Sequence, residues 1–479
     1  MSDEAFALLG EQGPFVQALS GFRPRLPQQE LARAIESALA ERGTLVAEAG
    51  TGVGKTFAYL VPALLSGRKV LLSTGTRTLQ DQLYHKDLPI VRNALGVQVR
   101  TALLKGRANY LCLHRHALAE QEHRWRSRDA ARHLALVRNW LPATESGDLS
   151  EVDGLPEDSE ILPRVTSTVE NCLGLECPDY NDCFVVQARR RAQEADVVVI
   201  NHHLFLADMA LREEGFGELL PSADAVILDE AHQLPDVASS FFGEQVSARQ
   251  IQELARDTVT EQVNEAPDMG SLRDTAGELE KAARDLRLAM GAEGQRGTRD
   301  ALLGRKGVED ALDGLADALE RLGQILELAA ERGKGLESCH GRCLLLHQRL
   351  KAWHQGAEGQ VAWFEVFRHG FSLNLTPLEV GGLFARQRER FPCAWVFTSA
   401  TLAVGKDFGH FTRRLGIEDA KECIFESPFD FSRQAMLYVP PAMPDPREPG
   451  YVQAVVERAL PLLEANGGRA FMLFTSYRA

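Results

Sequence analysis

The chain has 479 residues, a length typical of about three domains. Its composition, 44% hydrophobic and 25% charged, is that of a globular protein and excludes collagen-like or wholly disordered chains. The formal net charge of −14 argues against a generic polyanion binder but leaves room for a local basic groove. The sequence shows neither a signal peptide nor an apolar run of the ~18 residues that a membrane span needs. We therefore expect a cytoplasmic protein without membrane contact, whose cysteines are reduced.

Short apolar, β-branched segments alternate with helical patterns along much of the chain. A helix is predicted over 55–66, and strands are predicted over 44–48, 69–73, 196–200, 224–228, 393–397 and 469–474. Near-continuous apolar strands that alternate with helices indicate a parallel sheet buried on both faces. Residues that carry chemistry lie at the carboxyl ends of the strands in such sheets.

Two long segments, 102–193 and 247–370, interrupt this α/β pattern. The first holds four cysteines, and the second is helical in pattern. Within the second, leucines repeat at heptad-like spacing, at Leu312, Leu315, Leu319, Leu322 and Leu326. Because the repeat is short, it favours a helix hairpin that packs on itself over a coiled coil with a partner.

A glycine-rich segment follows the first predicted strand and opens the first predicted helix. It consists of Ala49, Gly50, Thr51, Gly52, Val53, Gly54, Lys55 and Thr56. This is the context of a P-loop, although Ala49 stands where the strict pattern has glycine. Backbone N–H groups of the loop can approach the β- and γ-phosphates of a nucleotide, Lys55 can bind them as a point charge, and Thr56 can bind Mg²⁺. A glycine-rich turn that binds nothing is the alternative, and the agreement of strand, loop and helix disfavours it.

A second chemical element follows the strand predicted over 224–228. It reads Asp229, Glu230, Ala231 and His232. An Asp at the end of a neighbouring strand can hold Mg²⁺, and the adjacent Glu230 can polarise an attacking water as general base. Two carboxylates alone would more often form a solvated turn. Together with the P-loop they predict a site that binds phosphates and Mg²⁺ and activates a water, and its candidate catalytic residues are Lys55, Thr56, Asp229, Glu230 and His232.

The P-loop and Asp-Glu-Ala-His together resemble the superfamily 2 helicases. Further segments carry the resemblance, namely Arg25-Leu26-Pro27-Gln28 (Q motif), Ser73 to Gln80 (motif Ia), Asn201-His202-His203-Leu204, and Thr398-Ser399-Ala400-Thr401 (motif III). Their order and the two insertions are similar to the XPD/DinG branch, and within it to the YoaA group of bacterial DinG-like helicases. The resemblance implies that Arg25 and Gln28 bind the adenine of ATP and that Thr74 and Thr76 touch the DNA backbone.

The resemblance implies an α/β fold, with a P-loop RecA-like motor domain that two insertions interrupt. Motor domain 1 would comprise 1–101, 194–246 and 371–430, the iron–sulfur insertion 102–193, the helical arch 247–370, and the start of motor domain 2 431–479. The implied activity is that of an ATP- and Mg²⁺-dependent DNA helicase that moves 5′ to 3′ on single-stranded or forked DNA. The implied role is DNA repair or damage tolerance, as a monomer at the bacterial nucleoid. A replication or repair protein is a possible partner, and the sequence does not identify it.

The sequence ends at Ala479, inside what resembles motif IV (471–476). Family members continue through motifs V and VI, and motif VI supplies an arginine that stabilises the transition state of hydrolysis. We therefore expect a fragment that binds ATP and DNA but turns over poorly. The alternative hypothesis is a nucleotide-gated module that binds single-stranded DNA, carries a redox-sensing cluster and does not unwind.

The first insertion holds one distant cysteine followed by three that lie closer together, at Cys112, Cys172, Cys177 and Cys183. Four thiolates suit an iron–sulfur cluster or a tetrahedral zinc ion, and the spacing alone leaves both open. The resemblance implies a [4Fe–4S] cluster on these four positions. The other cysteines are expected to be structural, at Cys339, Cys343, Cys393 and Cys423.

Residues 86–133 are locally basic, with ten Lys/Arg against four Asp/Glu. Basic groups suit a phosphate backbone, and aromatic faces stack on bases. The candidate DNA contacts in this region are Arg107, Tyr110, Arg115, Arg124 and Trp125. Solvated helix faces are the alternative. The sequence contains no base-reading motif, so we expect no sequence specificity.

Overall fold

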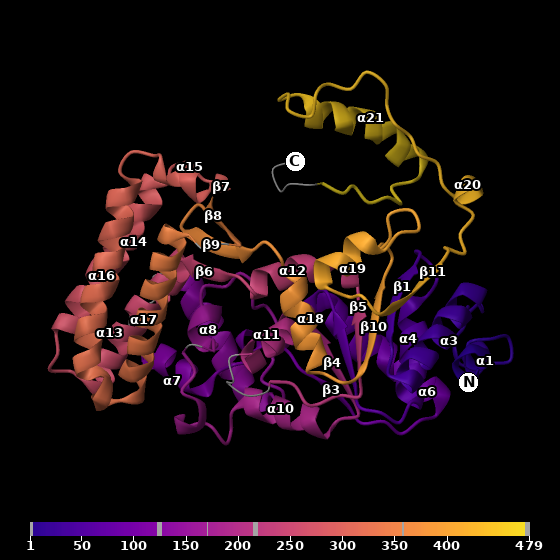
Figure 1. Cartoon of the computed structure of the whole chain (residues 1–479), viewed down its shortest axis with the longest axis horizontal. Coiled ribbons are helices and arrows are strands. Elements are labelled where there is room, and N and C mark those ends of the chain that lie inside the picture. The colour runs from indigo at the N-terminus through magenta and orange to yellow at the C-terminus, as the bar shows by residue number, and fades with distance from the viewer. Residues whose placement is uncertain (1–2, 122–126, 170, 214–218, 357–358, 475–479) are drawn as a thin grey trace. The chain divides into compact units, whose positions relative to one another are not determined.

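The structure is a computed structural model that describes residues 3–121, 127–169, 171–213, 219–356 and 359–474. The chain divides into two compact units, Met1–Pro428 and Phe429–Ala479. Unit 1 contains an α/β part, a cysteine-bearing insertion and a helical insertion (Figure 1). Among the helices in the described ranges, none combines the length and apolar character needed to cross a membrane.

The α/β part is built on a seven-stranded sheet in the order β11-β1-β10-β5-β2-β4-β3, and every neighbouring pair is parallel. The strands are β1 (Thr44–Ala49), β2 (Val70–Thr74), β3 (Thr101–Leu103), β4 (Val197–Asn201), β5 (Ala225–Asp229), β10 (Ala394–Ser399) and β11 (Ala420–Phe425). Alternate residues of β1 enter two different hydrophobic clusters, Leu45 one and Val46 the other. The expected parallel sheet with two buried faces is confirmed.

Helices follow most of these strands, so the segments singled out in the sequence lie at or near the connections between a strand and the next helix. The helices of this part are α1 (Glu4–Leu8), α2 (Pro14–Ala18), α3 (Leu26–Glu41), α4 (Lys55–Leu65), α5 (Arg77–Gln82), α6 (Leu88–Leu95), α11 (His202–Glu213), α12 (Leu234–Phe241), α18 (Gly381–Glu389) and α19 (Gly409–Leu415). Because the strands run parallel, the residues after β1, β2, β4, β5 and β10 meet at one edge of the sheet.

The cysteine-bearing insertion packs on the same hydrophobic core as one face of the sheet. Its helices are α7 (Leu113–Gln121), α8 (Arg128–Trp140), α9 (Leu162–Val165) and α10 (Phe184–Glu194). Loop segments connect them, and three of the four cysteines lie in the loop between α9 and α10. This insertion therefore shares a hydrophobic core with one face of the parallel sheet.

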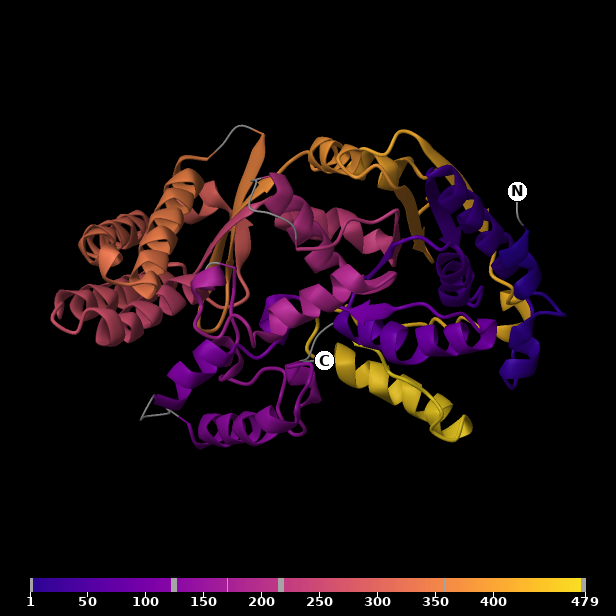
Figure 2. The same ribbon diagram turned by 90° about the horizontal axis from the view of Figure 1, so that it is seen from below.

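The helical insertion has a separate hydrophobic core. Four long helices pack side by side in both views (Figures 1 and 2), namely α13 (Ala248–Glu265), α14 (Ser271–Ala289), α16 (Val308–Ala329) and α17 (Lys334–Gln355). The leucines of the heptad-like repeat all lie on α16 and all are buried, at Leu312, Leu315, Leu319, Leu322 and Leu326. They pack within the chain, as predicted.

The helical insertion also contains a four-stranded antiparallel sheet that sequence reasoning missed, with the order β6-β9-β8-β7. Its strands are β6 (Glu244–Ser247), β7 (Arg296–Thr298), β8 (Gln360–Val366) and β9 (Phe371–Pro377), and the short helix α15 (Arg299–Leu303) follows β7. The expected boundary at 370/371 falls between β8 and β9, which pair along their whole length. Strand β9 therefore belongs to the arch, because its backbone groups are satisfied there.

Unit 2 contains α20 (Phe431–Gln434) and α21 (Tyr451–Ala465). The prediction of a strand over 469–474 is wrong: these residues carry no secondary structure, and the apolar side chains of Phe471 and Leu473 are almost fully exposed. A lone apolar segment needs neighbouring strands to pair with, and no strand lies among the described residues of unit 2. Thr475 and Ser476 of the expected motif IV lie outside the described residues.

Candidate functional site

The P-loop connects β1 to α4 at the carboxyl edge of the sheet. Gly52 and Gly54 have positive φ angles of 84° and 89°, which side chains rarely adopt. A Cβ atom at Gly54 would lie 2.3 Å from Nε2 of Gln28, so the close approach of these two residues requires glycine. The loop therefore has the shape and bare backbone that a phosphate group needs.

Gln28, on the first turn of α3, is 3% exposed and donates from Nε2 to the carbonyl of Gly54 at 2.9 Å. Among the described contacts, its Oε1 is buried and has no hydrogen-bond partner. A buried acceptor without a partner is costly, and a ligand that donates a hydrogen bond would satisfy it. Arg25 caps the same helix, and its Nη1 lies 3.7 Å from the position of a Cβ on Gly54.

The carboxylates that follow β5 face the start of α4. Nζ of Lys55 lies 3.8 Å from Oε1 of Glu230, and the Tyr59 hydroxyl donates to Oδ2 of Asp229 at 3.2 Å. Thr56, one position after Lys55, shares a hydrogen bond with Tyr59. Burial, and then the negative charge of Glu230, raise the pKa of Asp229 to about 6. The structure thus brings the P-loop and both carboxylates together.

Ser399, the last residue of β10, completes this cluster. Oγ of Ser399 lies 2.8 Å from Nδ1 of His232 and donates to Oε2 of Glu230 at 3.4 Å. Glu230 itself has a φ of 53°, an uncommon value for a residue with a side chain. Strain of this kind gathers at functional sites, where neighbouring contacts maintain it.

Sequence reasoning missed three residues that hold this edge in place. Tyr59 lies four residues after Lys55, on the same face of α4, and that spacing is the signal that could have found it. Glu48 accepts from the backbone N–H groups of Leu402 and Ala403 at 2.6 and 2.7 Å. Buried His202 lies 2.7 Å from the Ser73 hydroxyl, and burial lowers its pKa to about 3, so the ring is neutral. No local sequence pattern marks Glu48, whereas His202 belongs to the segment Asn201-His202-His203-Leu204 that carries the family resemblance, without a role assigned to it there.

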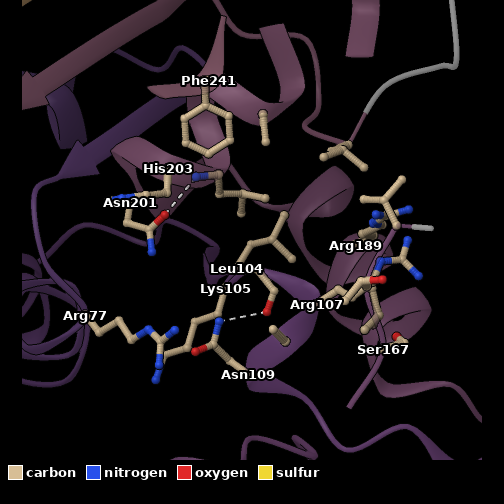
Figure 3. A pocket seen from close by; sticks show the side chains of 18 of the residues that line it. Arg77, Leu104, Lys105, Arg107, Asn109, Ser167, Arg189, Asn201, His203 and Phe241 are labelled. Atoms are coloured by element: carbon tan, nitrogen blue, oxygen red, sulfur yellow. Dashed lines mark hydrogen bonds between the residues drawn. The ribbon is translucent and has the colours of Figure 1, made fainter. Parts of the chain in front are cut away.

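A pocket of about 520 Å³ lies beside the segments that follow β2 and β4 (Figure 3). Three arginines line it, Arg77 from α5, Arg107 and Arg189 from the cysteine-bearing insertion, and the ring of Phe241 forms part of its wall. Burial and the neighbouring Arg107 lower the pKa of Arg189. Cations crowded in this way favour an anion such as a phosphate.

The residues expected to contact DNA lie in different environments. Arg107 and Thr76 line the pocket. Thr74 is 2% and Tyr110 3% exposed, and the Tyr110 hydroxyl accepts from the backbone N–H of Lys105, so neither presents a free face. Arg115 is paired with Asp257 of the arch at 3.2 Å. Thr74, Tyr110 and Arg115 are therefore buried or nearly buried by tertiary packing, and a local sequence pattern does not reveal such burial. The expected contacts Arg124 and Trp125 lie outside the described residues.

The four cysteines of the insertion are free thiols that are partly exposed. Backbone N–H groups of Arg115, Gly174 and Asp179 donate to the sulfurs of Cys112, Cys172 and Cys177 respectively. Burial, and to a smaller degree the charges of Cys177 and Cys172, raise the pKa of Cys112 to about 11. Across the described ranges, no three His, Cys, Asp or Glu side chains come close enough to hold a single metal ion.

The remaining cysteines lie elsewhere. Cys339 and Cys343 are buried in α17, and the thiol of Cys343 donates to the carbonyl of Leu319 at 3.1 Å. Cys393 is buried just before β10, and Cys423 is partly buried in β11. The expectation that helix packing accounts for Cys339 and Cys343 is confirmed.

Comparisons with known proteins agree with this geometry. Two family models match, DEAD/DEAH box helicase over residues 28–115 and DEAD_2 over residues 75–251. The chain is 45% identical over 469 residues to "ATP-dependent DNA helicase YoaA" of Escherichia coli (strain K12), which covers 97% of this chain and 73% of that protein. It is 29% identical over 532 residues to "ATP-dependent DNA helicase DinG" of Photobacterium profundum, with coverage of 96% and 74%.

A solved structure of an XPD helicase aligns with 92% of this chain and 70% of its own, with a TM-score of 0.46 and 16% identity. The family is shown by the YoaA relative, whose similarity extends over 97% of this chain. The resemblance drawn from the sequence motifs is thereby confirmed. The chain belongs to the XPD/DinG-type family of ATP-dependent DNA helicases and is close to the YoaA group.

Proposed function

We propose that this chain binds and hydrolyses Mg²⁺-ATP at the carboxyl edge of its parallel sheet, and that hydrolysis drives movement along single-stranded DNA held at the arginine-lined pocket. The observation that carries the proposal is the meeting of two distant segments. Lys55 of the P-loop and Glu230 after β5 lie 3.8 Å apart, with Asp229 and Ser399 beside them. Such a set can hold a triphosphate, a divalent cation and an attacking water.

On the adenine side, the proposal rests on Gln28. Its unsatisfied Oε1 would accept the exocyclic amine of adenine, and Arg25 stands next to it. On the phosphate side, backbone N–H groups of residues 51–56 would approach the β- and γ-phosphates, and Lys55 would neutralise their charge.

Lys55 is paired with Glu230 in the structure. A bound phosphate would compete for the ammonium group of Lys55, because a phosphate carries more charge than a carboxylate. Glu230 would then be free to accept a proton from the attacking water, while Thr56 and Asp229 hold Mg²⁺. His232 and Ser399, which both contact Glu230, would orient it. Nucleotide binding itself would therefore prepare the general base.

For DNA, the pocket supplies cations and an aromatic face. Arg77, Arg107 and Arg189 suit consecutive phosphates, and Phe241 with His203 offers a surface on which a base can stack. None of these groups distinguishes one base from another, so binding would not depend on sequence. By analogy with the family, we propose 5′ to 3′ movement and a role in DNA repair or damage tolerance.

We further propose that Cys112, Cys172, Cys177 and Cys183 hold a [4Fe–4S] cluster. Backbone N–H groups that point at three of the sulfurs fit thiolates bound to iron, whose potential such hydrogen bonds tune. The order of one distant cysteine followed by three closer ones also differs from the two close pairs that zinc modules usually show.

Metal analysis tests the cluster without relying on activity. After anaerobic purification we expect about four irons and about four acid-labile sulfides per chain. Cys172→Ser should lose iron and the visible absorption, whereas Cys423→Ser, a partly buried cysteine in β11, should keep both. Zinc in place of iron, or equal iron in both variants, would contradict the assignment.

The nucleotide site is tested by Lys55→Ala. This change removes the charge that binds the phosphates, so we expect ATP hydrolysis in the presence of single-stranded DNA to fall by at least about 100-fold. Lys421→Ala removes an exposed lysine from β11 and serves as the control with wild-type turnover. Hydrolysis that persists in Lys55→Ala would refute the motor site. DNA binding that responds to nucleotide without hydrolysis in the wild type would favour the nucleotide-gated module instead.

A further inference from the structure

The chain returns to the P-loop just before it leaves unit 1. Strand β11 lies at the edge of the sheet beside β1, and the residues after it cross the P-loop. The N–H of Gly50 donates to the carbonyl of Phe425 at 3.0 Å, and the hydroxyl of Ser427 donates to the carbonyl of Thr51 at 2.6 Å. Unit 1 ends at the next residue, Pro428.

The Ser427 hydroxyl determines which way one peptide of the P-loop faces. In a planar trans peptide the C=O and the next N–H point in opposite directions, and the structure contains no cis peptide in the described part. Because the Thr51 carbonyl is held toward Ser427, the N–H of Gly52 points away from it. Gly52 has a positive φ of 84°, so its backbone can otherwise turn over at little cost.

The contact is also tight. A Cβ atom on Gly50 would lie 2.8 Å from the backbone nitrogen and 3.1 Å from the Cβ of Ser427. Glycine at position 50 therefore allows residues 425–427 to lie against the P-loop. Its N–H group donates to the carbonyl of Phe425. The sequence alone assigned Gly50 to phosphate approach, and the structure gives it this additional partner.

We infer that Ser427 is a positioning residue for the nucleotide: it fixes the Thr51–Gly52 peptide so that the Gly52 N–H faces the bound phosphates. This inference rests on the proposed nucleotide site. Ser427 is the second-to-last residue of unit 1, so the same contact joins the P-loop to the end of this unit. Ordering of the P-loop by nucleotide must in turn order residues 425–427.

Equilibrium binding of methylanthraniloyl-ADP with Mg²⁺ tests the inference. Ser427→Ala should bind at least about tenfold more weakly, the cost of one misdirected hydrogen bond to a charged group. The matched control is Ser66→Ala at the far end of α4, whose hydroxyl donates to the Ala63 carbonyl at 2.8 Å. It should bind as the wild type does. The unfolding midpoint of Ser427→Ala should stay at the wild-type value, which separates positioning from loss of folding.

Hydrogen exchange gives a second readout that a merely structural serine would not change. Peptides that cover 420–428 should exchange more slowly when Mg²⁺-ADP is added to the wild type, and Ser427→Ala should lose this protection at saturating nucleotide. Wild-type affinity in Ser427→Ala, or unchanged protection, would overturn the inference. If the wild type fails to bind the nucleotide, the nucleotide site itself is contradicted and the inference falls with it.

Discussion

At the scale of a residue, the buried carboxylate of Asp229 in the proposed nucleotide site lowers the stability of the fold. Burial and the neighbouring Glu230 raise its pKa from 3.8 to about 6, so the folded chain holds this proton more tightly than the unfolded chain does. The stability of the nucleotide-free chain should therefore fall as pH rises from about 4 to about 6, and the loss persists above that range. A shift of about two units corresponds to about 3 kcal/mol.

Asp229→Asn removes the buried charge, so we expect a nucleotide-free chain that is up to about 3 kcal/mol more stable at pH 7.5 and gains about half as much at pH 5. Urea unfolding at the two pH values measures this. Asp153→Asn, an exposed loop carboxylate, is the control and should change stability little at either pH. A variant that is less stable than the wild type at pH 7.5 would show that Asp229 is a structural carboxylate.

The residues of the nucleotide site were predictable because their motifs are local. The P-loop and the Asp-Glu pair each occupy one strand end, and a parallel sheet brings strand ends to one edge. Tyr110 and Arg115 could not be placed in this way. Their burial depends on the core of the cysteine-bearing insertion and on Asp257, which lies far along the sequence. Of the basic and aromatic residues expected from the composition of 86–133, Arg107 lines the pocket, whereas Tyr110 and Arg115 are packed inside.

At the scale of elements, one buried carboxylate ties the arch to the cysteine-bearing insertion. Asp257 on α13 accepts from Arg115, three residues after Cys112, and from Arg342 on α17 at 2.7 Å. All three side chains are about one-tenth exposed. Removal of one partner from a buried ion pair leaves uncompensated charge and costs more than loss of an exposed pair.

Asp257→Asn should therefore destabilise the chain by about 3 kcal/mol or more, because both arginines lose their carboxylate. Glu278→Gln on α14 breaks the exposed pair with Arg321 and should cost no more than about 1 kcal/mol. Urea unfolding compares the two variants, and hydrogen exchange should place the added opening in α13 and α17. Equal effects in both variants would mean that the pair does not join the two insertions.

Five of the seven strands of the parallel sheet, β1, β2, β4, β5 and β10, were predicted to within two residues at each end, because buried parallel strands read as short continuous apolar runs. Strands β3 and β11 were not predicted, because β3 has only three residues and β11 is a partly exposed edge strand that mixes polar and apolar residues. The four-stranded sheet of the arch was missed for the opposite reason. Strands β6 and β7 are short and largely polar, and they become strands only by pairing with β8 and β9. The strand predicted over 469–474 does not form for a different reason: the segment is apolar, but no strand among the described residues of unit 2 is available to pair with it.

At the scale of the whole molecule, the net charge of −14 hides a local cationic site. Arg107 and Arg189 face the same pocket from the cysteine-bearing insertion, and the segment that follows β4 also lines it. The same segment includes the buried side chain of His202. The ring of His202 contacts the backbone of Asp229 and Glu230 at the end of β5. The arginine-lined pocket and the proposed nucleotide site thus share one edge of one sheet, and this arrangement would allow a motor to couple DNA binding with ATP hydrolysis.

ATP hydrolysis with and without single-stranded DNA tests that coupling most directly. The account predicts that DNA raises the wild-type rate and that the double change Arg107→Ala and Arg189→Ala removes most of this stimulation, with weaker salt dependence of DNA binding. The control is the double change Arg273→Ala and Lys281→Ala, which removes two charges from exposed positions on α14 and should leave the stimulation intact. Equal stimulation in the two double variants would contradict the pocket as the DNA site that drives the motor.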